Sequence, residues 1–316
     1  MEFSVQSKFV LSLDGGGSHL LIQLSLLACL EEETGISTYE KFDLVAGSSS
    51  GGLIACLIAG RAMSASKIIQ LILEDRLLEN MMTGNWMNLI LNKLQIYPKY
   101  TGDSKSRVLQ KALGCLRLSS LDKQLFIPCF NLDRDRLEIF SNYSRKNFLL
   151  REIADACTAV PSYFPPVQME DEEWRIDGGV GMNNPALAAY LHAKNIWPDC
   201  DIKVLSIGSG WRSFAFDGNK ACTYGGIQWS AKGIASIILR EKMMVNARMT
   251  DEILGEHVLY INHPLKKYGI PGHLDSANNP KRQLKTIEIG KLWYELNRHR
   301  IEKLLIDQPA KYISVA

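Results

Sequence analysis

The chain has 316 residues, of which 46% are hydrophobic and 22% charged, and its formal net charge is +2 at pH 7. This balance is that of an ordinary globular protein, so it excludes disorder or a fibrous repeat, and the near-neutral charge disfavours nucleic-acid binding. Seven cysteines lack the C-x-x-C spacing of zinc sites or disulfide frameworks, which predicts free thiols and no metal site. The length suits one large α/β domain or two smaller ones.

The sequence carries no recognisable targeting or membrane-spanning segment. Residues 1–8 are polar and lack the charged, apolar and small-residue regions of a signal peptide. The longest apolar runs, residues 20–30 and 53–59, are shorter than the ~20 residues that a membrane-spanning helix needs. We therefore expect a cytoplasmic protein or one that binds a membrane surface peripherally.

Short apolar strand patterns alternate with longer helical patterns along the chain. Strands are predicted at residues 9–13, 42–46, 125–131, 136–140 and 203–207. Helices are predicted at residues 20–33, 51–59, 65–82, 234–254 and 286–305. The alternation indicates a mainly parallel central sheet flanked by helices, in three α/β/α layers. Because no linker is recognisable, we expect a single domain over residues 1–316, in which residues 211–316 complete the fold.

Residues 47–51 read Gly-Ser-Ser-Ser-Gly, a G-x-S-x-G sequence between a predicted strand and a predicted helix. On such a turn the serine hydroxyl projects from the fold, and the small flanking residues relieve the crowding of the strained backbone. Ser49 would also stand at the helix N-terminus, where the helix dipole favours negative charge. We interpret Ser49 as a candidate nucleophile, and the alternative is a Gly/Ser-rich turn without chemistry.

Three consecutive glycines, Gly15, Gly16 and Gly17, follow Asp14 directly after the first predicted strand. Glycines let backbone N–H groups converge on one point, because no side chain blocks the approach. Acyl-transfer enzymes need such donors for the oxyanion of the tetrahedral intermediate. The alternative is a phosphate cradle, but the lysine of G-x-x-x-x-G-K-[ST] and the G-x-G-x-x-G pattern are both absent.

Asp177 ends a short apolar strand pattern and is followed by two glycines. A carboxylate in this position, with room beside it, can accept the proton of a serine hydroxyl and so act as a general base. An isolated Asp-Gly-Gly is more often a simple turn. The interpretation of Asp177 as a functional residue therefore depends on the other two motifs.

Together, these three motifs resemble those of the patatin-like phospholipase family in kind and in order. Residues 159–166 and 183–189 resemble the family's segments on either side of the Asp motif, and residues 205–210 resemble the strand that follows. The likeness extends from about residue 9 to residue 210. It implies a patatin-like fold over that part of the chain.

The resemblance also implies a Ser–Asp dyad without a histidine, in which Ser49 attacks an ester carbonyl and Asp177 accepts the proton of its hydroxyl. The oxyanion would be held by the backbone N–H groups of Gly15, Gly16, Gly17 and Ser50. The implied substrates are phospholipids or other acyl lipids. The implied reaction needs neither a metal nor an organic cofactor.

One segment departs from the family pattern. The family commonly continues its glycine turn as Gly-x-Arg-Gly, whereas residues 18–20 read Ser-His-Leu here, so His19 is the basic side chain at hand. The departure puts in doubt the shape of the helix start and the reaction rate. A Ser–Asp–His order is used by α/β-hydrolases, but of the histidines after Asp177 only His263, before Pro264, comes near such a position, and we interpret all of them as ordinary surface or core residues.

A lipid hydrolase needs an apolar surface near its catalytic mouth. Residues 81–91, rich in Met and Trp, and residues 234–245, with Arg240 and Lys242 beside an apolar face, are candidate contacts. Core packing would explain the first as well, and an ordinary amphipathic helix the second. Two alternative functions stay open: a serine esterase or thioesterase for soluble acyl substrates, and a catalytically silent lipid-binding or scaffold relative. Whether a partner protein activates the enzyme also stays open.

Overall fold

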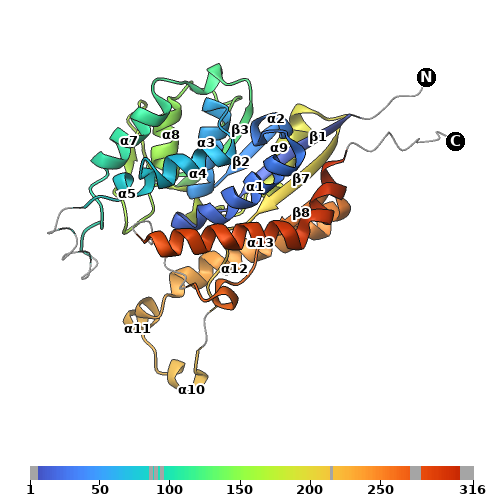
Figure 1. Cartoon of the computed structure of the whole chain (residues 1–316). Coiled ribbons are helices and arrows are strands. Elements are labelled where there is room, and N and C mark those ends of the chain that lie inside the picture. Colours follow the sequence, from blue (N-terminus) through green and yellow to red (C-terminus); the bar gives the residue numbers. More distant parts are fainter. Residues whose placement is uncertain are drawn as a thin grey trace, which may run out of the picture.

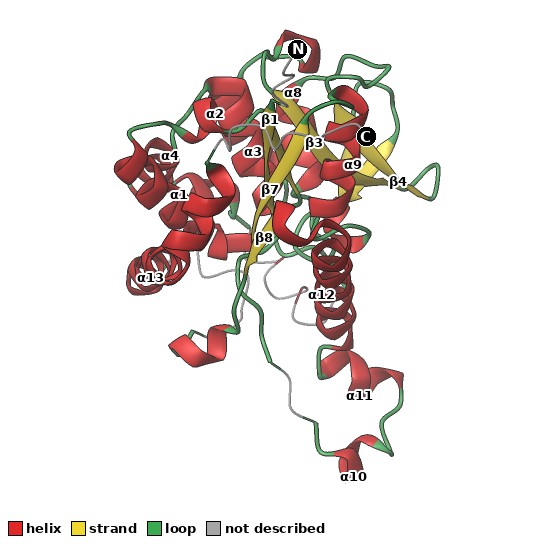
Figure 2. Ribbon diagram, turned by 90° about the vertical axis from the view of Figure 1, so that its right-hand side faces the viewer, coloured by secondary structure: helices red, strands yellow, loops and turns green. Residues whose placement is uncertain are grey.

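The computed structural model describes residues 6–84, 88, 92, 96–213, 216–270 and 279–306. An eight-stranded sheet lies at its centre, with helices on both faces (Figure 1). Figure 2 shows α1 (Leu20–Thr34) and α13 (Pro280–Leu305) on one side of the sheet and α9 (Ala186–Ile196) and α12 (Ile234–Leu254) on the other. The predicted three-layer α/β/α arrangement is therefore confirmed.

The sheet is parallel in one part and antiparallel in the other. Its strands are β1 (Ser7–Leu13), β2 (Leu44–Gly47), β3 (Gln124–Asn131), β4 (Arg136–Ser141), β5 (Val167–Gln168), β6 (Trp174–Asp177), β7 (Asp201–Ile207) and β8 (Val258–Ile261). The order is β5-β6-β3-β2-β1-β7-β8, and β4 also pairs with β3. The strands from β3 to β8 along this order are parallel, whereas β4, β5 and β6 join antiparallel. The sheet is thus mixed, and the predicted parallel pattern holds for its central strands.

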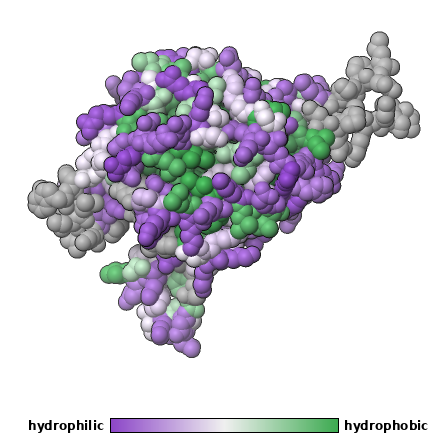
Figure 3. Space-filling model, viewed as in Figure 1, coloured by the Kyte–Doolittle hydropathy of each residue, from purple (hydrophilic) through white to green (hydrophobic). Residues whose placement is uncertain are grey.

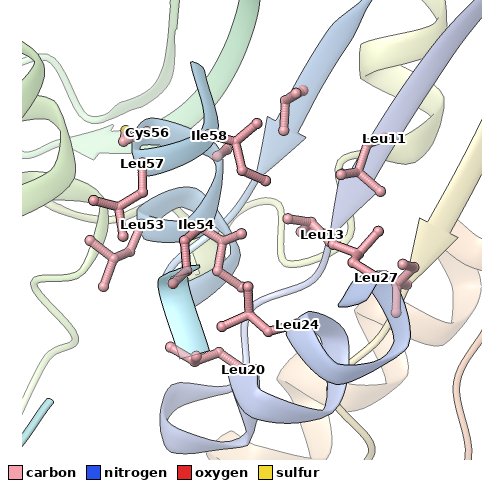
Figure 4. Packing of buried hydrophobic residues seen from close by; sticks show 14 of the residues in the cluster. Leu11, Leu13, Leu20, Leu24, Leu27, Leu53, Ile54, Cys56, Leu57 and Ile58 are labelled. Atoms are coloured by element: carbon pink, nitrogen blue, oxygen red, sulfur yellow. The ribbon is translucent and has the colours of Figure 1, made fainter. Parts of the chain in front are cut away.

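The main hydrophobic core lies between the parallel strands and the helices α1 and α3 (Ser50–Arg61). Figure 4 shows leucine side chains of α1 meeting Leu53 and Ile54 of α3 and Leu13 of β1. The outer side of α1 is covered by α13, where a Cβ on Gly290 would overlap the Ile22 carbonyl. Because α1 is enclosed on both sides, its sequence is apolar nearly all round.

The remaining helices lie around this frame. They are α2 (Thr38–Lys41), α4 (Ala65–Leu73), α5 (Leu77–Met81), α7 (Asp103–Leu113), α8 (Leu150–Cys157), α10 (Gly218–Ala221) and α11 (Gly226–Ala231). α13 begins six residues before the predicted start at residue 286, because the Asn279 side chain accepts a hydrogen bond from the Arg282 N–H and caps the first turn.

The single helix predicted over residues 65–82 is wrong. The chain forms α4 and α5 instead, and Arg76 between them has a left-handed backbone with φ of 54°. An ion pair between Arg76 and Glu79 accompanies this turn. The break turns Leu77, Leu78 and Met81 into the core, and the burial of these side chains outweighs the cost of one strained residue.

Among the described helices, no single one is long and apolar enough to cross a membrane. α3 and α4 reach that length and composition only as a pair, bent by 116°. α3 is buried in the core almost throughout.

Candidate active site

Ser49 occupies the turn between β2 and α3, with φ of 52°, a value that non-glycine residues seldom adopt. The flanking glycines allow this turn to form against neighbouring backbone. A Cβ on Gly47 would overlap the Gly51 carbonyl, and a Cβ on Gly51 would overlap the Leu13 carbonyl at the end of β1. Close packing therefore holds the strained backbone, and Ser49 stands at the N-terminus of α3.

The glycine turn after β1 lies directly beside Ser49. A Cβ on Gly15 would come within 2.9 Å of the Ser49 Cβ. Gly17 has φ of 57°, a conformation that favours glycine. The Gly15 carbonyl accepts hydrogen bonds from the Ser209 hydroxyl at 3.0 Å and the Asn183 side-chain amide at 3.3 Å. Neither Ser209 nor Asn183 was predicted as a site residue, although both lie in segments that resemble the family.

The N–H groups of the turn differ in how they are used. The Gly15 N–H donates to the Asn183 carbonyl at 3.2 Å, and the Gly16 N–H donates to the Ser50 hydroxyl at 3.0 Å. Within the described residues, no acceptor takes the Gly17 N–H. The Ser50 N–H belongs to the first turn of α3, whose donors have no partner inside the helix. The N–H groups of Gly17 and Ser50 are therefore the donors most open to a substrate oxygen, whereas the Gly16 N–H would first have to leave the Ser50 hydroxyl.

Asp14, which the sequence reasoning did not single out, directly precedes this turn and is held by a network of hydrogen bonds. Its carboxyl accepts hydrogen bonds from the Tyr260 hydroxyl at 2.7 Å and from the Asn184 side-chain amide at 2.8 Å. Asn262 donates to the Tyr260 hydroxyl at 2.6 Å and accepts from the Gly210 N–H at 2.8 Å. Burial raises the pKa of Asp14 to about 8, although both of its hydrogen bonds act in the opposite direction. The network links the ends of β1, β7 and β8.

Asp177 ends β6 and is almost fully buried. Its N–H donates to the Ala159 carbonyl at 3.1 Å, and its Oδ1 accepts from the Gly179 N–H at 2.7 Å. Burial raises the pKa of Asp177 to about 6, whereas the Ser49 hydroxyl, the Gly179 N–H and the charge of Lys105 lower it. No well-aligned hydrogen bond joins Ser49 to Asp177, and Oδ2 lacks a partner among the described residues. Such contacts commonly tighten when substrate binds.

The cation that acts on Asp177 is itself buried. Lys105, from α7, is 2.9 Å from the Asp155 carboxylate and lies 4.3 Å from the centre of the Phe164 ring. The sequence gives no signal for this arrangement, because Lys105 lies in an amphipathic helix like any surface lysine. Its charge favours the ionised form of Asp177, which is the form that a general base requires.

Ser49, Asp177 and the glycine turn all face one cavity of about 720 Å³. The apolar side chains that line it include Met82, Val160, Phe164, Ile238, Leu239 and Met243. Arg212 and Arg240 also border the cavity. Of the predicted contact segment 81–91, residues 85–87 and 89–91 lie outside the described residues. The other predicted contact, residues 234–245, forms part of the cavity wall.

The histidines take different positions. Over the described part of the chain, His19 is the histidine that lines the cavity, and it stands just before α1, which begins at Leu20. The helix therefore starts directly after the turn although the sequence departs from the family there. His263 follows β8 and packs edge-on against Trp293 at 5.0 Å, away from the cavity wall. His273 lies outside the described residues.

No group of three or more His, Cys, Asp or Glu side chains in the described part of the chain could hold a metal ion. All seven cysteines are free thiols.

The chain is similar to several known proteins in sequence. The family described as patatin-like phospholipase matches residues 11–190. Patatin-like protein 2 of Oryza sativa subsp. indica is 26% identical, over 97% of this chain and 87% of its own length. Probable inactive patatin-like protein 9 of Arabidopsis thaliana is 30% identical, over 64% of this chain and 60% of its own.

Among solved structures, VipD from Legionella pneumophila aligns with a TM-score of 0.48 at 15% identity, over 94% of this chain and 67% of its own. The match to the family covers more than half of the chain, and it includes Ser49 and Asp177. The chain belongs to the patatin-like phospholipase family.

Proposed function

We propose that this protein hydrolyses carboxylic esters of phospholipids or other acyl lipids, with Ser49 as nucleophile and Asp177 as general base. The observation that carries the proposal is the meeting of three elements in one cavity. These are a hydroxyl on a strained turn, a buried carboxyl and a glycine turn with backbone donors. Membership of a lipid-hydrolase family supports the same function.

In the first step, Asp177 takes the proton of the Ser49 hydroxyl while Oγ forms a bond to the ester carbonyl carbon. The carbonyl oxygen becomes an oxyanion, which would accept hydrogen bonds from the N–H groups of Gly16, Gly17 and Ser50. To accept them, it must replace the Ser50 hydroxyl as the acceptor of the Gly16 N–H. Each such donor contributes about 2.7–4 kcal/mol in comparable sites.

The intermediate then collapses, the ester bond breaks, and the leaving alkoxide takes the proton from Asp177. A water molecule gives its proton to Asp177 and attacks the Ser49 acyl ester, which releases the fatty acid and restores the serine hydroxyl. A base works best when its pKa lies near the working pH. The pKa of about 6 for Asp177 is closer to neutrality than the ordinary value of 3.8.

The cavity supports a substrate with long apolar chains. Its wall is mainly apolar and includes Met, Val, Ile, Leu and Phe side chains, which can bury acyl chain carbons at about 0.8 kcal/mol for each CH₂. We infer that the protein is either cytoplasmic or bound peripherally to a membrane, and that it reaches such substrates at the membrane surface.

The test is replacement of Ser49. Ser49→Ala should abolish both fatty-acid release from phospholipid vesicles and covalent labelling by a fluorophosphonate probe. Ser48→Ala is the matched control, because this neighbouring hydroxyl has no hydrogen-bond partner among the described residues and should be dispensable. Circular dichroism would show that both variants fold.

Three outcomes decide between the functions left open. Hydrolysis that survives Ser49→Ala contradicts the proposed mechanism. Equal rates above and below the micellar threshold of a lipid ester indicate a soluble-ester hydrolase. A folded wild-type protein that takes up no fluorophosphonate indicates a silent relative. Inactivity is part of the name of one relative, Probable inactive patatin-like protein 9 of Arabidopsis thaliana.

A further inference from the structure

One part of the chain lies outside the layered fold. Residues 216–233, which we call the lobe, carry the short helices α10 and α11 and project away from the body in both ribbon views (Figure 1) (Figure 2). Neither α10 nor α11 contains a buried residue. The lobe therefore adds almost nothing to the core, so its sequence needs another explanation.

Aromatic side chains hold the lobe together. The Trp229 ring lies 5.7 Å from the Phe216 ring and 5.5 Å from the Tyr224 ring, measured between centroids. Beside this cluster, Ile227 is 85% exposed. Trp and Tyr rings favour the boundary between water and lipid, where one end is apolar and the other wet. The space-filling view shows apolar surface beside strongly polar surface on the projecting part (Figure 3).

The apolar surface continues toward the catalytic cavity. α12 begins three residues after α11 ends, and its exposed side chains Ile238 and Leu239 line the cavity. Trp211, where the chain enters the segment that leads to the lobe, also lines the cavity. The lobe thus stands beside the mouth through which a substrate would enter.

The charge of this region differs from that of the chain as a whole. Residues 211–242 carry five Lys or Arg and two Asp or Glu, which is a net charge of +3, whereas the complete chain has +2. The rest of the chain is therefore slightly acidic. A positive surface interleaved with aromatic and apolar side chains is complementary to an anionic bilayer. The same positive charge would oppose docking of a second copy through this region.

We propose that the lobe and the first half of α12 dock onto an anionic phospholipid bilayer, so that the cavity mouth opens directly onto the lipid. As a statement about how the substrate is reached, this inference rests on the proposed function. Ile227 and the aromatic cluster would enter the headgroup boundary, while Lys220 and Lys232 would remain among the lipid phosphates.

Binding can be measured apart from catalysis. The full chain would be sedimented with vesicles of ether-linked phosphatidylcholine, alone or mixed with an equal amount of ether-linked phosphatidylglycerol, which contain no carboxylic ester to hydrolyse. Wild type should bind the mixed vesicles at least about tenfold more tightly than the neutral ones. Ile227→Asp should weaken binding to the mixed vesicles about tenfold or more, and Ile36→Asp, at an exposed isoleucine outside the lobe, should not.

A charge variant supplies a milder change. Lys232→Gln should lower the partition onto mixed vesicles about fivefold, whereas Lys67→Gln on the exposed side of α4 should leave it unchanged. Equal binding to neutral and mixed vesicles overturns the proposal, as does wild-type binding by Ile227→Asp. So does a lipid-free dimer that Ile227→Asp dissociates, since the lobe would then join two copies. Vesicle binding without fatty-acid release from ester lipids would sustain docking and defeat the proposed hydrolysis.

Discussion

The floor of the cavity and the lobe beside its mouth are built in opposite ways. Ser49 and Asp177 are only 8% and 2% exposed, and backbone from several strands surrounds them. In the lobe, α10 and α11 have no buried residue. The floor can therefore hold reacting atoms at fixed positions, but it tolerates little change. Substitutions in the lobe should have little effect on the stability of the fold. The lobe's sequence should matter mainly for the surface that the lobe contacts.

The largest effect should come from Asp177, the proposed base in the floor. The rate of fatty-acid release should fall as the pH drops below about 6, because Asp177 then becomes protonated and cannot accept a proton. Asp177→Asn should lower the rate by about 10²–10⁴-fold at neutral pH. Steady-state kinetics across the pH range check both results. A rate that stays constant down to pH values well below the pKa of Asp177 would contradict its role.

The same substitution should stabilise the protein at neutral pH. The pKa of Asp177 is higher in the folded chain than its ordinary value of 3.8, so stability from this group is lost as the pH rises from about 4 to about 6. Asp177→Asn should therefore increase the free energy of unfolding by at most about 3 kcal/mol above pH 6 and by little below pH 4. Denaturant titrations at several pH values measure this free energy. Asp199→Asn, at an exposed aspartate, is the control.

A pair of glycine substitutions compares the two regions directly. Gly51→Ala should destabilise the protein by about 1–3 kcal/mol and abolish labelling of Ser49, because the new methyl group overlaps the Leu13 carbonyl. Gly226→Ala, in the lobe, has no atom within 4 Å of its new Cβ. It should leave the free energy of unfolding unchanged or raise it by up to about 1 kcal/mol. Equal losses from both variants would remove the contrast between floor and lobe.

The smallest loss of stability should come from the hydrogen-bond network around Asp14, next to the glycine turn. Tyr260→Phe removes the donor to Asp14 and the acceptor of the Asn262 amide, so the free energy of unfolding should fall by about 1–2 kcal/mol. Tyr143→Phe, at an exposed tyrosine, is the matched control. Urea unfolding of both variants provides the measurement, and equal stability of the two would show that the network does not support the turn.

Much of the fold follows from local sequence patterns. The predicted strands, α1, α3 and α12 lie within a few residues of their predicted positions, because hydrophobic periodicity and glycine punctuation act over short stretches. The break at Arg76 was not predictable in this way. A continuous helix satisfies the local pattern of residues 65–82, and only packing against the core favours the turn.

The candidate site likewise combines features that local sequence predicts with features that only tertiary packing decides. The turn that presents Ser49 is encoded by five consecutive residues between a strand and a helix, so the sequence alone could predict it. The tertiary structure decided which groups meet that turn. Asp14 and Tyr260 are 246 residues apart yet share a hydrogen bond, and Lys105 reaches the surroundings of Asp177 from a separate helix. Local patterns specify backbone shape, whereas burial, pKa and the walls of a cavity arise only when distant segments pack together.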